Sequence, residues 1–504
     1  MRKVFIYDTT LRDGEQMAGV NLNAGEKLRL AFHLQRLGVD CIEAGFPASS
    51  VNDFKAVQKI ASQVEGVQIS ALARADKNDI DTALEALKDA KNKKLHIFIA
   101  TSDLHMEQKL HMTREEVLER VRDAVTYGRS KCDTVLFSCE DATRSDREFL
   151  CKVYETAIEC GACTVNIPDT VGYTTPEEFA DTVKYVLANV KNISRSQIGV
   201  HCHNDLGLAV ANTVAGLAAG ASWAECTVNG IGERAGNASL EEVVMALYTR
   251  REHYGLETGI NTTLIAKTST VVSAVTGVYL APNKAIVGRN AFLHESGIHQ
   301  HGILNNPLTY EIISPATVGI STSEIVLGKH SGRHAFCDKL TELGFHVDKS
   351  VSDDAFEAFK NLSCRKKTLS DDDIKALVEE AIMDSHIKDG YELVSYQTQS
   401  GNKTRAMAMV CISKGKEIHD EAATGEGPID AAFNAINRIV GVEYKLLNYG
   451  IKAVTGGTDA LGEVRVRIAD DEKEAVGKGV STDIIESSIK AYISAINRVD
   501  LQNN

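Results

Sequence analysis

Ile198-Gly199-Val200-His201-Cys202-His203-Asn204-Asp205 joins a short apolar run to a His-x-His pair. The apolar run predicts a β-strand, and side chains on a strand alternate between its two faces. His201 and His203 therefore share one face, where their ring nitrogens can converge on a cation. On its own such a pair is more often two unrelated histidines, so its place in the chain decides its meaning.

Short runs of this kind alternate with longer helical patterns through the first 267 residues. Eight strands, each followed by a helix, are typical of a (β/α)₈ barrel of the TIM type. Helical patterns cover Ala24–Leu37, Arg114–Tyr127, Arg147–Cys160 and Pro176–Val190, with Thr113 and Ser145 or Asp146 as N-caps. The predicted strands are Val4–Tyr7, Cys41–Ala44, Val67–Ala73, Leu95–Ala100, Thr134–Phe137, Thr164–Ile167, Ile198–His203 and Ala224–Val228.

Polar segments follow five of these strands. In a (β/α)₈ barrel the chemistry gathers on the loops at the carboxyl ends of the strands, so we expect these segments to meet at one mouth. His201 and His203 end the seventh strand, and the other segments are Asp8–Gln16, Ser138–Asp141, Pro168–Thr170 and Asn229–Asn237.

The composition is that of an ordinary globular protein with small-molecule partners. The chain has 504 residues, 43% of them hydrophobic, and a formal net charge of −14, which argues against nucleic acid or an anionic membrane as partner. Eleven scattered cysteines form no disulfide framework and fit the reducing cytoplasm. We expect no secretory signal and no membrane span, because Met1-Arg2-Lys3 leads into a strand and no apolar run reaches about 18 residues.

The chain beyond the barrel divides into two further predicted regions. Residues 268–389 lose the strand/helix alternation and form a mainly helical linker region, which contains three histidines within His294–His301. Residues 390–504 form an α+β domain with an internal repeat, in which Ala435-Ile436-Asn437-Arg438-Ile439 corresponds to Ala495-Ile496-Asn497-Arg498-Val499. The repeat predicts two similar sheet-plus-helix units, which either hold a ligand between them or are a duplication for packing.

Oxygen ligands are needed to complete a metal site at His201 and His203. Asp13 on the first loop and Asn237 on the eighth are the candidates, because the first, seventh and eighth strands are neighbours once the barrel closes. Two nitrogens, a carboxylate and an amide oxygen suit Mn²⁺, Zn²⁺ or Mg²⁺. Arg12 is placed to stabilise an oxygen that gains negative charge, or else to form an ion pair with a carboxylate such as Glu43.

Asp8–Gln16, His201–Asp205, Gly232–Asn237 and Ser296–Gln300 together resemble the acyl-CoA-condensing synthases, metal-dependent TIM-barrel enzymes that join acetyl-CoA to a 2-oxo acid. The resemblance covers nearly the whole chain. It implies that Asp13, His201, His203 and Asn237 bind a divalent metal, manganese by expectation, with magnesium or zinc as alternatives. It also implies that Arg12 stabilises the keto oxygen and the enolate, that Thr170 holds the substrate carboxylate, that Glu140 lies beside the acceptor's side chain, and that His299 takes part in acid/base chemistry.

Within this family the features Phe137–Ala142, Asn166–Thr174 and Asn229–Asn237 are nearest to the enzymes that make 2-isopropylmalate. The activity implied is that of an acyltransferase which converts the acyl group to an alkyl group on transfer. It condenses acetyl-CoA with 3-methyl-2-oxobutanoate, the first committed step of leucine biosynthesis. The resemblance further implies inhibition by leucine through a regulatory domain at 390–504, and a domain-swapped homodimer in which His299 serves the neighbouring subunit.

Three other activities remain open at this stage. Citramalate synthases use pyruvate and homocitrate synthases use 2-oxoglutarate, whose second carboxylate needs a cation for which Arg74 is the best candidate, although a surface position is the more common one for such a residue. A metal-dependent lyase or aldolase would use a similar barrel without the C-terminal regions.

His96 and Phe98 are expected to fill the barrel core, with lining of the substrate pocket as the alternative.

Overall fold

The computed structural model describes residues 1–294, 299, 302–303, 306–320, 324–325, 327, 331–365, 369–384, 390–453, 461–470 and 473–501. Most of the predicted motif Ser296–Gln300 and the predicted domain boundary Asp389 lie outside these residues, whereas His299 lies within them. The chain forms two compact units, Met1–Leu293 with Glu311–Ser323, and His294–Tyr310 with Glu324–Asn504.

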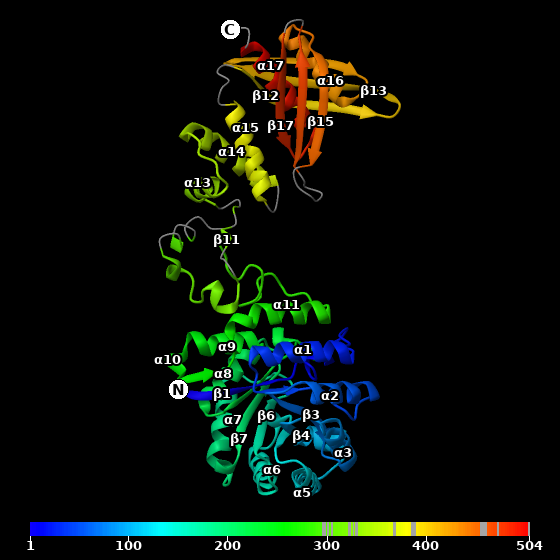
Figure 1. The fold of residues 1–504 in the computed structure, drawn as a ribbon, viewed down its shortest axis with the longest axis vertical. Coiled ribbons are helices and arrows are strands. Elements are labelled where there is room, and N and C mark those ends of the chain that lie inside the picture. Colours follow the sequence, from blue (N-terminus) through cyan, green and yellow to red (C-terminus); the bar gives the residue numbers. More distant parts are fainter. Residues whose placement is uncertain are drawn as a thin grey trace. The chain divides into compact units, whose positions relative to one another are not determined.

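The first unit contains the predicted barrel (Figure 1). Its strands are β1 (Arg2–Asp8), β2 (Cys41–Glu43), β3 (Gln68–Arg74), β4 (Lys93–Ala100), β5 (Val135–Glu140), β6 (Thr164–Asp169), β7 (Gln197–Cys202), β8 (Trp223–Cys226) and β9 (Leu256–Thr258). Within residues 1–294, described throughout, β1 to β8 are parallel neighbours in chain order, and pairing of β1 with both β8 and β2 closes the barrel. The additional strand β9 pairs with the start of β1.

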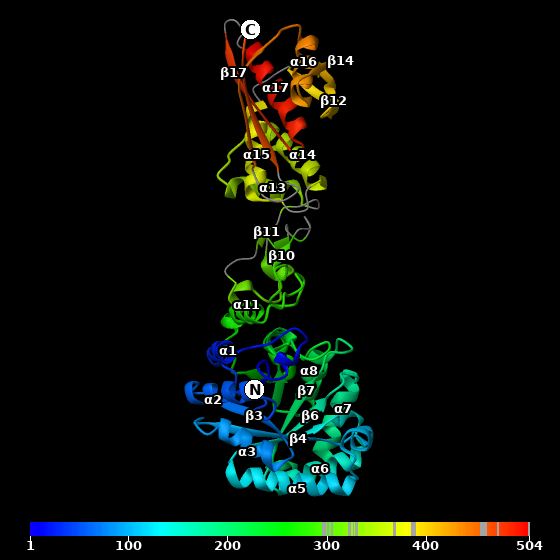
Figure 2. The same ribbon diagram turned by 90° about the vertical axis from the view of Figure 1, so that its right-hand side faces the viewer.

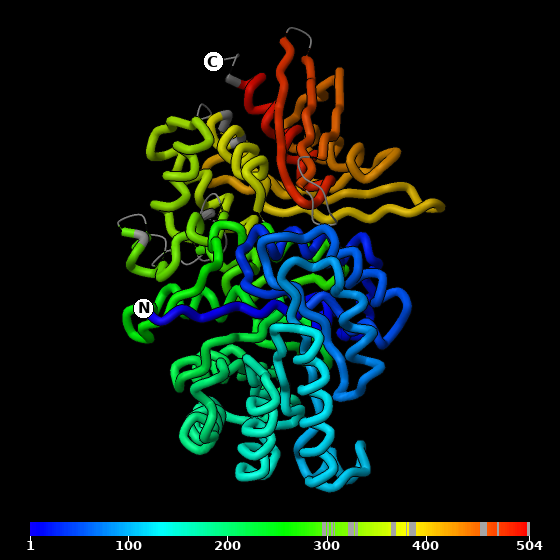
Figure 3. The backbone as a smooth tube through the Cα atoms, turned by 60° about the horizontal axis from the view of Figure 1, so that its bottom comes forward, coloured from blue at the N-terminus to red at the C-terminus, as the bar shows by residue number. Residues whose placement is uncertain are grey.

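Helices surround this barrel, as the tube in Figure 3 also shows. They are α1 (Ala24–Leu37), α2 (Val51–Gln63), α3 (Lys77–Ala86), α4 (Asp103–His105), α5 (Arg114–Lys131), α6 (Arg147–Glu159), α7 (Pro176–Asn189), α8 (Ala209–Ala219), α9 (Leu240–Thr249), α10 (Arg251–Tyr254) and α11 (Ile265–Thr276). Short helical turns are η1 (Gly14–Gln16), η2 (Met106–Leu110), η3 (Ala142–Arg144), η4 (Ile193–Arg195), η5 (Val228–Gly230) and η6 (Thr262–Leu264).

Local sequence explains where these helices begin. Thr113 accepts a hydrogen bond from the Glu116 amide while Glu116 bonds back, a capping box that satisfies free backbone N–H groups at the start of α5. Asp146 caps α6 by accepting from the Phe149 amide. Both caps confirm the prediction, and the predicted helix Ala24–Leu37 coincides with α1.

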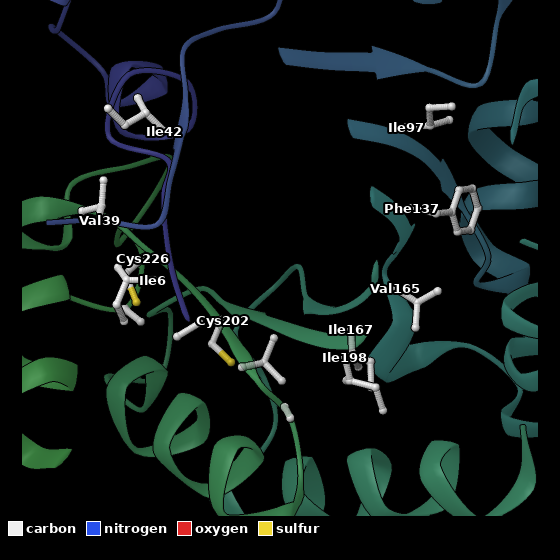
Figure 4. Close-up of a cluster of buried hydrophobic side chains, with 14 of the residues drawn as sticks. Ile6, Val39, Ile42, Ile97, Phe137, Val165, Ile167, Ile198, Cys202 and Cys226 are labelled. Atoms are coloured by element: carbon white, nitrogen blue, oxygen red, sulfur yellow. The ribbon is translucent and has the colours of Figure 1, made fainter. Parts of the chain in front are cut away.

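The strand periodicity separates two environments. Apolar side chains at alternate positions pack into the core between barrel and helices, among them Ile6, Ile97, Phe137 and Val165 (Figure 4). The intervening positions carry buried polar side chains such as Glu43, His96 and Asn166, together with a small apolar cluster of Tyr7, Cys41, Leu136 and Trp223. The fold class predicted from the alternation of strands and helices is confirmed.

The helical region after the barrel has its own small core. Phe336 and Phe359 are fully buried there, with ring centroids 5.0 Å apart. The elements are β10 (Leu293–His294), η7 (Pro307–Thr309), η8 (Pro315–Val318), β11 (Glu324–Ile325), α13 (Arg333–Glu342), α14 (Lys349–Arg365) and α15 (Asp371–Asp384). Ser370 caps α15 by accepting a hydrogen bond from the Asp373 amide.

Two units of three antiparallel strands and a helix make up the described part of 390–501, as the repeat predicts (Figure 2). They are β12 (Tyr391–Gly401), β13 (Thr404–Lys414), β14 (Glu417–Gly425) and α16 (Pro428–Val440), followed by β15 (Lys445–Ala453), β16 (Gly462–Ala469), β17 (Glu474–Ser481) and α17 (Ile484–Leu501). The two helices share one core, in which Phe433 and Tyr492 stack with ring centroids 4.0 Å apart.

Candidate active site

Asp13, His201 and His203 form a buried group at the carboxyl ends of the barrel strands. Each offers a ligand atom within 4.8 Å of the others'. Asp13 Oδ2 lies 3.8 Å from His201 Nε2 and 3.7 Å from His203 Nε2, while the two imidazole rings lie 4.8 Å apart. His203 lies one residue beyond β7 and pairs as an isolated bridge with Asn237, so the predicted strand is one residue too long at this end.

Asn237 completes the arrangement from the loop after β8. Its Nδ2 donates to Asp13 Oδ1 at 2.7 Å and to the Ile231 carbonyl at 3.1 Å, which orients the amide. Its Oδ1 is buried and has no hydrogen-bond partner among the described residues. An unpartnered buried acceptor beside a carboxylate and two imidazoles fits an oxygen ligand to a cation. A side chain at Gly232 would overlap the Asn237 amide, so the loop requires glycine there.

The charges in this group suit a cation. Burial raises the pKa of Asp13, but the charge of Arg12, with further contributions from the two imidazoles and from the hydrogen bond that Asn237 donates, outweighs it and lowers that pKa to about 2. Burial and the neighbouring His201 lower the pKa of His203 to about 4. An ionised carboxylate and a neutral imidazole at neutral pH are the protonation states that metal ligands need.

Glu225 on β8 is a site residue that the sequence analysis missed. Its Oε1 lies 3.3 Å from His201 Nδ1, on the opposite side of the ring from the nitrogen that faces Asp13. The carboxylate raises the pKa of His201 against the lowering effect of burial. A carboxylate behind an imidazole commonly fixes the ring orientation of a metal-binding histidine.

Arg12 is held by three carboxylates. Its guanidinium donates to Glu43 at 2.7 Å, to Asp13 at 2.6 Å and to Glu225 at 3.0 Å. The ion pair with Glu43, considered as the alternative to a catalytic role, is therefore present. These bonds use three of the five N–H donors, so two remain for a ligand in the cavity that Arg12 lines.

A hydrogen-bonded chain of buried side chains crosses the barrel interior below this site. Glu43 accepts from Tyr7, and His96 Nδ1 lies 2.6 Å from Glu43. His96 Nε2 bonds Ser138, and Asn166 Nδ2 bonds both Ser138 and Glu225. His96 and Phe98 line the cavity, so the expectation that they only fill the core is wrong for these two residues. Polar residues at inward positions of five strands were the feature of the sequence that could have identified this hydrogen-bonded chain.

The cavity at the mouth of the barrel measures about 250 Å³. Its lining includes Arg12, Asp13, His201, His203, Thr170 and Glu140, so six of the predicted residues meet there, with Asn237 buried beside Asp13. Glu140 is paired with Lys109 at 2.6 Å, a cavity-lining cation that the sequence analysis missed. A larger hollow of about 680 Å³, lined by residues such as Lys3 and Lys93, lies at the amino-terminal ends of the strands and contains no predicted site residue.

Two other predicted residues, Arg74 and His299, are not among the residues that line this cavity. Arg74 forms a two-point ion pair with Asp79, its side chain is 62% exposed, and it does not line the cavity. This is the surface position considered for it, so it supplies no cation for a second substrate carboxylate. His299 belongs to the second compact unit, where its ring lies 4.3 Å from that of Tyr310.

Among the described residues, none of the helices combines the length and the apolar character needed to cross a membrane. The cysteines whose side chains are described are all free thiols.

Comparison with known families agrees with the order of the regions. Residues 3–272 match the HMGL-like family, and residues 286–367 match the homocitrate synthase post-HMGL domain-like family. Residues 368–500 match the LeuA allosteric (dimerisation) domain.

Curated relatives match over nearly the full length. A 2-isopropylmalate synthase of Ruminiclostridium cellulolyticum is 53% identical over 497 residues, covering 99% of this chain and 97% of its own. The one of Pyrococcus furiosus is 53% identical and covers 99% of both chains, and the one of Aquifex aeolicus is 52% identical and covers 98% and 96%. The chain belongs to the 2-isopropylmalate synthase family of acyltransferases.

Proposed function

We propose that this chain condenses acetyl-CoA with 3-methyl-2-oxobutanoate and releases 2-isopropylmalate and CoA, the first committed step of leucine biosynthesis. The observation that carries this proposal is the buried group of Asp13, His201 and His203 beside Arg12 at the mouth of the barrel, in a chain whose full-length relatives carry that enzyme's name. The alternatives with pyruvate or 2-oxoglutarate, and the lyase, have no such support.

Asp13, His201, His203 and Asn237 would hold the divalent ion. Manganese is the proposed ion, with magnesium or zinc as alternatives, because a mixed set of imidazole, carboxylate and amide donors suits all three. When bound, the ion would act as a Lewis acid on the acceptor's keto group. Glu225 would hold the His201 ring from behind, since its carboxylate lies 3.3 Å from Nδ1.

Arg12 would bind the keto oxygen of the acceptor, and Thr170 would bind its carboxylate. The two free N–H donors of Arg12 stabilise the negative charge that develops on the keto oxygen. Thr170 Oγ1 already accepts from the Asp141 amide at 2.9 Å, so its own hydroxyl proton is available for the acceptor carboxylate. Glu140, whose charge is balanced by Lys109, would lie beside the acceptor's side chain.

His299 would take part in proton transfer at the acetyl group. Removal of a methyl proton from acetyl-CoA gives an enolate, whose carbon forms the new bond to the keto carbon of the acceptor. Water then cleaves the thioester and releases CoA. General acid–base help of this kind is worth about 10²–10⁴-fold in rate. In a domain-swapped homodimer, which we propose here, His299 reaches the barrel of the neighbouring subunit.

The C-terminal domain would bind leucine and inhibit the reaction. The support is the match of residues 368–500 to the LeuA allosteric (dimerisation) domain, together with the paired sheet-plus-helix units. We retain the proposed division into a catalytic barrel at 1–267, a linker at 268–389 and a regulatory domain at 390–504.

A thiol assay of CoA release from acetyl-CoA with Mn²⁺ tests the proposed function. We expect preference for 3-methyl-2-oxobutanoate over pyruvate and 2-oxoglutarate, and a lower rate when leucine is added. Arg74→Ala is the control and should keep the same preference, because Arg74 does not line the cavity. Preference for pyruvate or 2-oxoglutarate would mean that the enzyme uses that acid as its acceptor. Absence of thiol release with all three acids would refute the synthase activity.

A further inference from the structure

Arg234, on the loop after β8, joins two other loops of the barrel mouth. Its Nε and Nη2 donate to the Asp205 carboxylate at 2.8 and 3.0 Å, in the planar two-point geometry that guanidinium and carboxylate share. Nη2 also donates to the Thr170 carbonyl at 2.7 Å. Asp205 follows β7 and Thr170 follows β6, so one side chain connects the ends of three neighbouring strands.

Thr170 is thereby held from both sides. The Asp141 amide donates to its side-chain oxygen at 2.9 Å, and Arg234 donates to its carbonyl. The first bond sets the position of the oxygen, and the second sets the peptide that carries the side chain. A hydroxyl held this way needs little reordering when it donates to an anion, which favours binding.

The backbone around this contact leaves little freedom. Arg234 has φ 57°, in the left-handed region that is strained for a non-glycine residue. Gly172, two residues after Thr170, has φ 58°. It lies so close to the loop after β7 that a β-carbon at this position would be 2.6 Å from Asp205 Oδ2. A strained conformation persists only where surrounding contacts hold it, and the ion pair with Asp205 is such a contact.

We propose that Arg234 is a positioning residue for the acceptor: through its bonds to Asp205 and to the Thr170 carbonyl, it sets the Thr170 hydroxyl for the substrate carboxylate. The inference rests on the proposed function, in which Thr170 binds that carboxylate. Arg234 also lines the cavity, so the experiments below separate an action through Thr170 from a direct bond to the acceptor.

Arg234→Gly is the first test, because glycine adopts φ 57° without strain while the side chain is removed. Losing a charge-assisted hydrogen bond is worth about 10- to 100-fold, and we expect a rise of that order in KM for 3-methyl-2-oxobutanoate. The KM for acetyl-CoA should change less than about threefold, because the lost bonds concern only the acceptor carboxylate. Guanidinium ion added at millimolar concentration should lower the raised KM again.

Thr170→Val and the double variant decide between the two ways in which Arg234 could act. If Arg234 works through Thr170, the double variant has about the same KM as Thr170→Val alone, because the two changes share one interaction. If Arg234 contacts the acceptor directly, the two effects multiply, and the proposal is overturned. A fall in kcat and melting temperature with unchanged acceptor KM would also overturn it, since that result indicates a purely structural ion pair.

Arg129→Ala is the matched control. Arg129 also bonds one carboxylate, Asp133, and one backbone carbonyl, that of Cys132, but it lies in the last turn of α5, on the side of the barrel away from the cavity. Its loss should leave the acceptor KM unchanged, and an equal rise in this control would refute a specific role for Arg234. If Thr170→Val leaves the acceptor KM unchanged, the role proposed for Thr170 fails. If only Arg234→Gly leaves it unchanged, the inference fails and the proposed function stands.

Discussion

At the residue scale, the site depends on charges that compensate one another inside the barrel. Arg12, Asp13, Glu43 and Glu225 are all nearly removed from solvent, and Arg12 bonds each of the three carboxylates. Removing one partner of a buried pair costs about 3–5 kcal/mol, because the remaining charge is left without compensation. Since Arg12 keeps two carboxylates when Asp13 is removed, the fold tolerates changes at Asp13 better than changes at Arg12.

Asp13→Ala and His201→Ala are expected to give folded proteins. Their metal-dependent turnover should fall by at least about 10²–10⁴-fold. Thiol release with Mn²⁺ measures activity, far-ultraviolet circular dichroism measures folding, and electron paramagnetic resonance measures bound Mn²⁺. Cys202→Ala is the control, because Cys202 lies between the two histidines but packs in the apolar core between barrel and helices. Appreciable Mn²⁺-dependent turnover in either variant would contradict the ligand assignment.

Asp8 makes folding stability depend on pH. Burial raises its pKa to about 7, although hydrogen bonds from Thr10 oppose this. The unfolded value is about 3.9, so the stability that the neutral carboxyl contributes is complete below about pH 4 and is lost as pH rises through about 7. The loss is at most on the order of 4 kcal/mol, at about 1.4 kcal/mol per unit.

Asp8→Asn should remove this part of the pH dependence, because an amide stays neutral. Urea unfolding at pH 5 and pH 8 measures the effect, and the variant should lose less stability between these values than the parent chain does. Asp133→Asn, at a fully exposed carboxylate, should behave like the parent chain. Equal pH slopes for Asp8→Asn and the parent chain would disprove the assignment.

At the scale of secondary-structure elements, each barrel strand serves two functions at once. Its outward positions pack against helices, and its inward positions supply polar groups such as Glu43, His96 and Glu225. In the second unit an ion pair ties α15 to β17, in which the buried Lys478 lies 2.9 Å from the exposed carboxylate of Glu379. Lys478 also lies 3.1 Å from Glu463 on β16. The core of α13, α14 and α15 also includes Leu461 and Val480. These helices are therefore partly stabilised by the C-terminal domain.

A chain cut near Asp389 is expected to lose leucine inhibition, because the proposed regulatory domain is removed. Its activity should also fall, since the cut exposes part of the core around α15 and removes a region that can brace the dimer. Thiol release with and without leucine measures both effects. Inhibition of undiminished strength in the shortened chain would show that leucine acts elsewhere.

At the scale of the whole molecule, the residues proposed to act in catalysis are divided between the two compact units. The metal group and Arg12 belong to the first unit, whereas His299 belongs to the second. In the proposed domain-swapped dimer, each site therefore combines the barrel of one subunit with His299 of the other. This arrangement predicts complementation between inactive variants.

Co-expression of Asp13→Ala with His299→Ala chains is expected to restore activity. Random pairing makes about half of the dimers mixed, and each mixed dimer regains one of its two sites, so about a quarter of the parent activity should return. Asp13→Ala with His201→Ala is the control and should stay inactive, because both changes lie in the barrel. Absence of recovery in the first mixture would mean that His299 serves its own subunit or no site at all.

The sequence alone determined the barrel, the repeat and the principal metal-site candidates. Strand and helix periodicities and capping residues such as Thr113 are local properties of the sequence. Closure of a parallel barrel places the carboxyl ends of its strands at one mouth, whatever the lengths and sequences of its loops. Asp13, His201, His203 and Asn237 could be named for that reason, and the structure brings them together.

Only the tertiary structure decided which groups compensate these charges. Glu225 is 213 positions from Arg12, Lys109 is 31 from Glu140, and Arg234 is 64 from Thr170. No local pattern links such residues, because each pairing depends on the paths that separate loops take after the strands end. Periodicity thus fixes which face of a strand is polar, whereas the partner of each buried charge follows from closure of the barrel and the geometry of its loops.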